Sequence, residues 1–182
     1  MAVWTHIAHE SLSLPASEVD WDDISQSYDH LVILISARNS GTSNFLTEAY
    51  LRVGDGSVDT GSNYSATRLA AEGSASVASD RETSQSKVRL IQIGNDSVED
   101  DTFSAVEVWI PHYANTANFK QFVIKGSVEN TSVSTDSPRA WVVYNVAGLW
   151  QSTDNIDEIQ ILTSADNFMA NSTFDLYGIL GV

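Results

Sequence analysis

The chain has 182 residues, no cysteine, and 24 acidic against 9 basic side chains, for a formal net charge of -15 at pH 7. A strongly negative protein repels phosphate backbones and anionic lipid headgroups, which argues against nucleic-acid and membrane-surface binding. The absence of cysteine excludes disulfides and thiolate nucleophiles. Because 42% of the residues are apolar, we expect residues 1–182 to form one folded domain and not an acidic disordered tail.

The amino-terminal stretch MAVWTHIAHESLSLP lacks the basic start and the continuous apolar run of a secretory signal. No later stretch is apolar for the length of a membrane-spanning helix. The sequence therefore predicts a protein made without a signal peptide.

Short apolar runs rich in Val, Ile, Tyr, Trp and Thr alternate with clusters of Gly, Asn, Asp and Ser along the whole chain. This pattern is typical of strands joined by turns. We expect about ten or eleven strands. The clearest cover His30–Arg38, Phe45–Val53, Lys87–Ile93, Thr102–Ile110, Lys120–Glu129, Arg139–Val146, Ile156–Thr163 and Thr173–Ile179.

Several of these runs alternate between apolar and polar residues, which indicates one buried and one wet face. The run HLVILIS is apolar on both faces, so we expect it to lie centrally in a sheet. No window keeps a helical stripe, and His112–Phe119 could form at most a turn or two. The sequence predicts an all-β, jelly-roll-like antiparallel β-sandwich of about 8–11 strands with minimal helix. Gly73–Ser86 and Asn130–Pro138 are predicted loops.

One stretch of the sequence matches a catalytic motif. Val58-Asp59-Thr60-Gly61-Ser62 has the apolar-Asp-Thr-Gly-Ser pattern of aspartic proteases. Such a motif needs an apolar strand leading into the aspartate, whereas turn-forming residues precede this one. We therefore expect Asp59 to hydrogen-bond its own turn. No GxSxG and no phosphate-binding glycine loop occurs, and we predict a protein without a catalytic site.

Two acidic loops offer oxygen atoms of the kind that calcium prefers. Asp55, Asp59 and Asn63 form the first, and residues 95–101 the second. Neither matches the twelve-residue loop of a helix-loop-helix calcium site, so solvated loops are the favoured interpretation.

The histidines give no metal motif, because His6 and His9 should point to opposite faces of a regular strand. We predict no metal site and no cofactor.

Aromatic residues in a β-domain either fill the core or contact partners at the surface. Trp150 lies in the predicted turn GLWQST and is the strongest candidate for a partner contact. Trp109, Tyr113 and Tyr177 complete the predicted interface.

A set of ordered landmarks spans roughly Trp4 to Val182. The landmarks are Tyr28–Arg38, Asn63–Leu69, Val108–Asn115 with Lys120, Gly148–Thr153 with Ile156 and Ile159, Asn167-Phe168, and Ser172–Ile179. In their order they resemble a family of small β-rich structural proteins of tailed bacteriophages. The Asn-Gly-Asp turn of that family is replaced here by Val53-Gly-Asp-Gly56 and a longer loop.

The resemblance implies a virion component made in the host cytoplasm, without a catalytic role. The expected function is a capsid decoration or cement protein that self-associates, as a trimer by family analogy. Its partners would be the major capsid protein or other virion proteins. The alternative is a tail-fibre or head-fibre module that binds host carbohydrate or a receptor.

Overall fold

The computed structural model describes residues 2–43, 45–72, 76–130 and 141–181. This part of the chain contains twelve strands and no helix, and so no helix capable of crossing a membrane. The strands are β1 (Val3–Ser11), β2 (Glu18–Trp21), β3 (His30–Ala37), β4 (Leu46–Gly54), β5 (Tyr64–Glu72), β6 (Ser76–Gln85), β7 (Val88–Gly94), β8 (Ser104–Pro111), β9 (Lys120–Val128), β10 (Val142–Trp150), β11 (Glu158–Thr163) and β12 (Thr173–Leu180).

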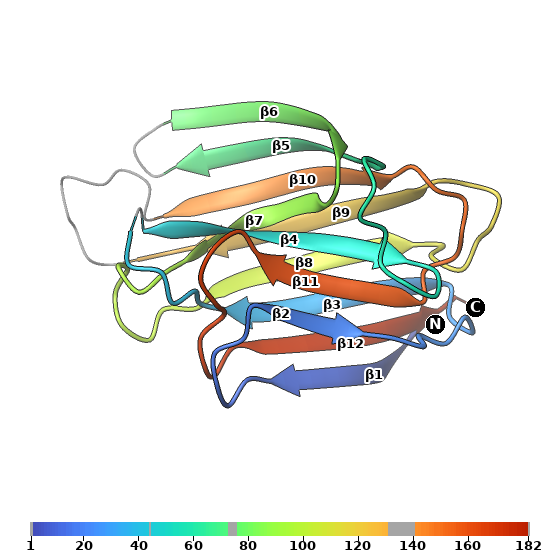
Figure 1. Cartoon of the computed structure of the whole chain (residues 1–182), viewed down its shortest axis with the longest axis horizontal. Coiled ribbons are helices and arrows are strands. Elements are labelled where there is room, and N and C mark those ends of the chain that lie inside the picture. The colour runs from blue at the N-terminus through green and yellow to red at the C-terminus, as the bar shows by residue number, and fades with distance from the viewer. Residues whose placement is uncertain (1, 44, 73–75, 131–140, 182) are drawn as a thin grey trace.

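The strands form two sheets that pack face to face (Figure 1). The large sheet has eight strands in the order β1-β12-β3-β8-β9-β10-β5-β6, and the small sheet has four in the order β2-β11-β4-β7. Every paired strand runs antiparallel to its neighbour. The predicted all-β sandwich is therefore confirmed.

The strand order has jelly-roll topology once two additions are set aside. The strands β1-β12-β3-β8 and β2-β11-β4-β7 form two four-stranded sheets, with the chain passing repeatedly from one sheet to the other. The antiparallel pairs β5/β6 and β9/β10 are added side by side at the β8 edge of the first sheet. These additions make the large sheet twice as wide as the small one.

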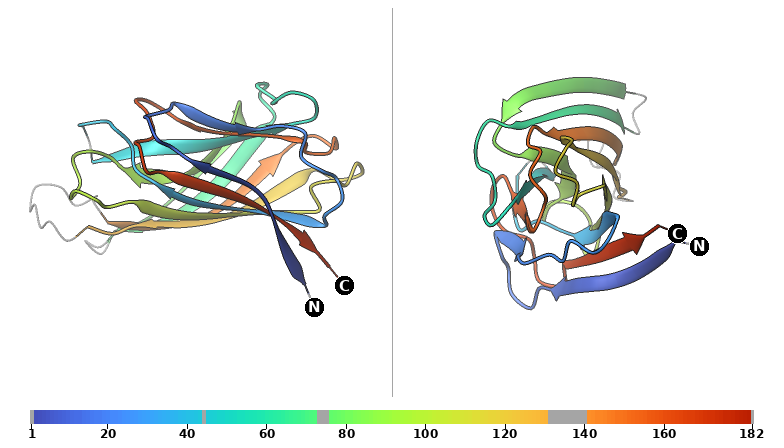
Figure 2. Two further views of the ribbon diagram at one scale, coloured as in Figure 1. Left: turned by 90° about the horizontal axis from the view of Figure 1, so that it is seen from below. Right: turned by 90° about the vertical axis from the view of Figure 1, so that its right-hand side faces the viewer.

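Apolar side chains from the facing surfaces of the two sheets form a single core. Leu31 and Ile33 of β3 lie in the same buried cluster as Leu51 of β4 and Ile159 of β11. Strand β3 lies between β12 and β8, as its apolar sequence predicts. The two ends of the chain lie close together, because Val3 pairs with Leu180 (Figure 2).

The predicted loop over Gly73–Ser86 is wrong for most of its length, because Ser76–Gln85 forms the edge strand β6. A strand at a sheet edge is held by backbone hydrogen bonds to one neighbour and needs no apolar stripe. Its polar sequence therefore resembles that of a loop. The other predicted loop, Asn130–Pro138, lies outside the described residues except for Asn130.

Candidate functional site

The face of the large sheet that points away from the small sheet, here called the outer face, is the most apolar exposed surface among the described residues. On β10 the side chain of Val143 is 62% exposed, and the strand register places Leu69, Val77 and Val123 on the same side. The large exposed apolar residues of this face are Trp4, Leu34, Leu69, Val77, Val123 and Val143.

The outer face carries almost no net charge, although the chain as a whole is strongly acidic. The register places two acidic side chains, Glu107 and Asp175, and two basic ones, Arg81 and Lys125, on this face. Glu107 pairs directly with Lys125 across β8 and β9. The excess of acidic over basic side chains in the described chain therefore lies elsewhere.

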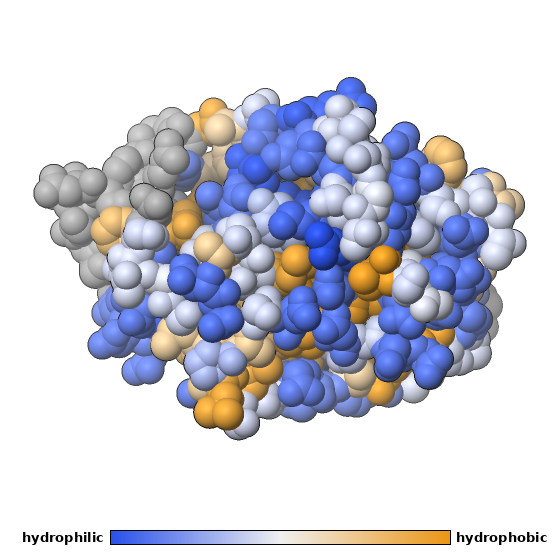
Figure 3. All heavy atoms as spheres, in the orientation of Figure 1, coloured by the Kyte–Doolittle hydropathy of each residue, from blue (hydrophilic) through white to orange (hydrophobic). Residues whose placement is uncertain are grey.

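The opposite side of the molecule, formed by the small sheet, is mostly hydrophilic (Figure 3). Glu18, Asp20, Glu48 and Gln160 project from this side, because their neighbours along each strand enter the core. Arg52 and Arg89 lie on this side as well, next to Gln160 and Glu48. The two broad faces of the sandwich thus differ in polarity.

An open groove of about 660 Å³ crosses the outer face from β10 to β12. Leu34, Ala105 and Val143 supply its apolar lining, and Asp175 lies at its β12 end. The groove gives the outer face a concave region into which a partner's side chains could fit.

An aromatic cluster lies on the outer face beside the groove. The Trp4 ring lies 6.4 Å from the Trp109 ring and 5.8 Å from the Tyr177 ring. The His30 ring contacts Trp109 at 5.5 Å. Beneath this cluster, Val32 is fully buried although it points to the outer face.

The predicted interface residues divide into two groups. Trp109 and Tyr177 are half-buried members of the aromatic cluster on the outer face. Trp150 and Tyr113 instead belong to the core, and Trp150 is only 2% exposed. The expectation that Trp150 contacts a partner is therefore wrong, because β10 continues to Trp150 and turns its side chain inward.

Asp59 is held within its own turn, as the sequence predicts. One carboxylate oxygen accepts a hydrogen bond from the Gly61 backbone N–H at 2.7 Å. The other accepts from Asn63 at 2.8 Å and from the Trp150 indole at 2.7 Å. Burial would raise the pKa of Asp59, but these three hydrogen bonds outweigh it and hold the pKa below its usual value. Both oxygens are thus engaged by N–H donors.

The second acidic loop is organised by Arg38, which the sequence does not single out. The buried guanidinium donates to the Glu99 carbonyl at 2.8 Å and to the Val98 carbonyl at 3.2 Å. It also forms an ion pair with Asp96 at 3.2 Å. A cation from the protein itself therefore offsets part of the negative charge of this loop.

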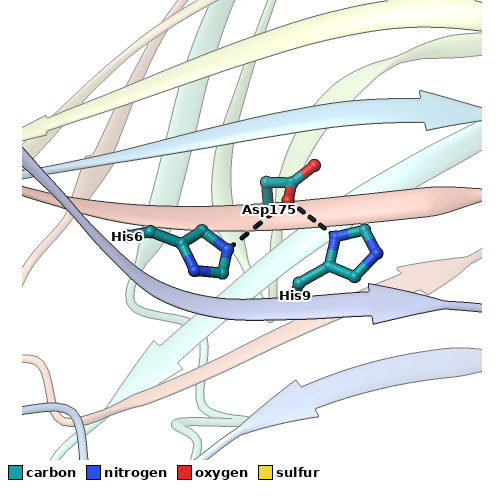
Figure 4. Close-up of side chains that lie close together, drawn as sticks. All are labelled: His6, His9 and Asp175. Carbon is teal, nitrogen blue, oxygen red and sulfur yellow. Dashed lines mark hydrogen bonds and ion pairs between the residues drawn. The ribbon is translucent and has the colours of Figure 1, made fainter.

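His6, His9 and Asp175 meet at the β1 edge of the outer face (Figure 4). The expectation that the two histidines point to opposite faces is wrong. The pairing of β1 with β12 shifts register between His6 and Ala8, so Ile7 is an extra residue. The shift turns both imidazoles toward Asp175, and no feature of the single sequence reveals it.

No family model matches the chain, and no curated protein matches it significantly.

Proposed function

We propose that this chain is a structural, non-catalytic module that self-associates through the outer face of its large sheet. The observation that carries the proposal is the combination of exposed apolar side chains with balanced charge on that face. Two copies with a net charge of -15 each repel one another, so a contact between them is favoured at a surface where basic side chains balance the acidic ones.

The outer face is large enough for a stable contact. Eight strands spaced about 4.8 Å apart, each about 8 residues long, cover on the order of 1,000 Å². A standard interface buries about 800 Å² on each partner. The groove and the aromatic cluster supply the concave and aromatic features that are enriched in such interfaces.

The kind of particle is proposed from the resemblance of the ordered landmarks to those of tailed-phage structural proteins. We propose a capsid decoration or cement role, in which a trimer binds the major capsid protein at the particle surface. Trimeric assembly and the location in the virion rest on this resemblance. A jelly-roll sandwich with one apolar and one hydrophilic face suits a protein that covers another surface.

Sedimentation equilibrium on the whole chain tests self-association. Val143→Lys places a charge in the groove, and we expect it to weaken association at least ten-fold. Leu14→Lys is the matched control, because Leu14 is 74% exposed in the connection between β1 and β2. A parent chain that stays monomeric, or equal weakening by both variants, would contradict the proposal.

Attachment to a particle needs a separate experiment. Purified protein is expected to bind expanded capsids that lack it and to raise their resistance to heat. Val143→Lys should bind less well if attachment requires the oligomer. Failure to bind or to protect capsids would overturn the decoration role while leaving self-association intact.

A fibre module that binds carbohydrate is the second candidate, and the exposed ring of Trp4 favours it. Tryptophan at a surface stacks on sugar rings. Glycan-array binding that Trp4→Ala abolishes would support this alternative. Trp150→Ala cannot serve this purpose, because Trp150 lies in the core.

A further inference from the structure

Two imidazoles and a carboxylate converge at the edge of the outer face, and strand geometry explains why. His6 pairs with Tyr177 and His9 pairs with Asp175. Positions 175 and 177 are two residues apart on β12, so their side chains share one face. The extra residue Ile7 brings His6 and His9, three positions apart, onto that same face.

The distances suit three ligands of one metal ion. The Asp175 Oδ1 atom lies 3.6 Å from His6 Nε2 and 2.7 Å from His9 Nδ1. The three ligand atoms all lie within 4.8 Å of one another. A tetrahedral ion with bonds of about 2.0–2.1 Å holds its ligand atoms roughly 3.3 Å apart. Changes of up to about 1.5 Å in these separations, which small side-chain rotations can supply, would therefore create the ligand spacing.

The surroundings partly orient the ligands and leave them accessible. The His6 ring packs against the Tyr177 ring with centroids 5.3 Å apart, which restricts its rotation. The side chains of His6 and His9 are 50% and 47% exposed, so an ion can reach them from solvent. Asp175 is anchored on β12, between β1 and β3.

The ligand types select the class of metal. Imidazole nitrogen is a preferred ligand of Zn²⁺, Cu²⁺ and Ni²⁺, whereas Ca²⁺ and Mg²⁺ require mainly oxygen ligands. We propose that His6, His9 and Asp175 form a binding site for a divalent transition-metal ion, with Zn²⁺ as the best fit. Three protein ligands leave the fourth tetrahedral position for water or another donor.

Isothermal titration of the whole chain with zinc chloride tests the site. We expect one ion per chain, and affinity at least ten-fold lower in His6→Gln and in His9→Gln. Both side chains are exposed, so the variants should keep the fold, which thermal melting checks. Asp175→Asn should weaken binding as well, since it removes the charge that offsets the ion's own.

His112→Gln is the matched control. The His112 ring lies 4.8 Å from the His30 ring on the same side of the molecule, and it lacks the arrangement around Asp175. We expect its zinc affinity to equal that of the parent. No measurable zinc binding, unchanged affinity in His6→Gln and His9→Gln, or equal loss in His112→Gln would overturn the proposal. Displacement of zinc by millimolar Ca²⁺ or Mg²⁺ would contradict the proposed class of metal.

Discussion

At the scale of single residues, Asp59 shows how a catalytic-looking motif serves a structural role. Its two oxygens accept three hydrogen bonds, one of them from the indole of Trp150. The turn after β4 is thereby tied to the end of β10. These three hydrogen bonds fix the orientation of the carboxylate between its own turn and the end of β10.

Asp59→Asn should lower the free energy of unfolding at pH 7 by about 1–2 kcal/mol. The asparagine NH₂ group would take the place of one carboxylate oxygen. In either orientation it would face an N–H donor, that of Gly61 or that of Trp150, and one hydrogen bond would be lost. Urea denaturation measures the loss. Asp55→Asn is the control, because Asp55 is exposed in the same loop and accepts a single hydrogen bond, from Asn155.

The difference in unfolding free energy between the parent and Asp59→Asn should depend on pH. The pKa of Asp59 is lower in the folded chain than in the unfolded chain. Its ionised form therefore contributes stability above the unfolded pKa of about 3.9, and this contribution is lost as pH falls through the folded pKa. The difference between parent and Asp59→Asn should narrow below about pH 4. A difference that stays constant down to pH 2 would contradict this assignment.

At the scale of elements, the strands that could be predicted are those whose pattern reflects burial. Strand β8 alternates between core and outer face as its sequence indicates, and β3 is central as its apolar run indicates. Strand β6 is not evident from the sequence because most of its residues are polar, and it is held by backbone pairing and ion pairs. The β1 bulge was missed because an extra residue leaves no mark in composition or period.

The ion pairs beneath β6 predict how its stability can be altered. Arg89 of β7 pairs with Glu82 and with Asp80 of β6, the latter at 3.5 Å. We expect Arg89→Met to lower the local opening free energy of β6 by about 1 kcal/mol, which accelerates amide exchange there roughly five-fold. Hydrogen exchange read by mass spectrometry measures it.

Two comparisons control this prediction. Arg81→Met alters a basic side chain of the same strand that points to the outer face, and it should leave β6 exchange near the parent rate. Amides of β9 in the middle of the sheet should be unaffected by either variant. Equal acceleration in β6 and β9 would mean that Arg89→Met destabilises the whole fold and not the edge strand.

At the scale of the whole molecule, the wide sheet explains the asymmetry of the surface. The four-stranded sheet covers the eight-stranded one on one side, and no strand of the described residues covers its outer face. The sequence marks outer-face residues such as Val123 and Val143 as apolar strand positions, but it cannot show that their side faces outward. That knowledge requires the order of the strands, which brings distant segments together.

The charge balance of the outer face on an acidic chain predicts a salt dependence for self-association. If copies meet through the charge-balanced outer face, the remaining electrostatic force between them is repulsion between chains of net charge -15. Salt screens this repulsion over a Debye length that falls from about 30 Å at 0.01 M to about 8 Å at 0.15 M. Sedimentation equilibrium should therefore show tighter association at 0.15 M than at 0.01 M sodium chloride. Val143→Lys should associate more weakly than the parent at both concentrations, since its defect lies in the apolar contact itself. Association that weakens as salt is added would instead indicate contacts between opposite charges and would contradict the outer face as the interface.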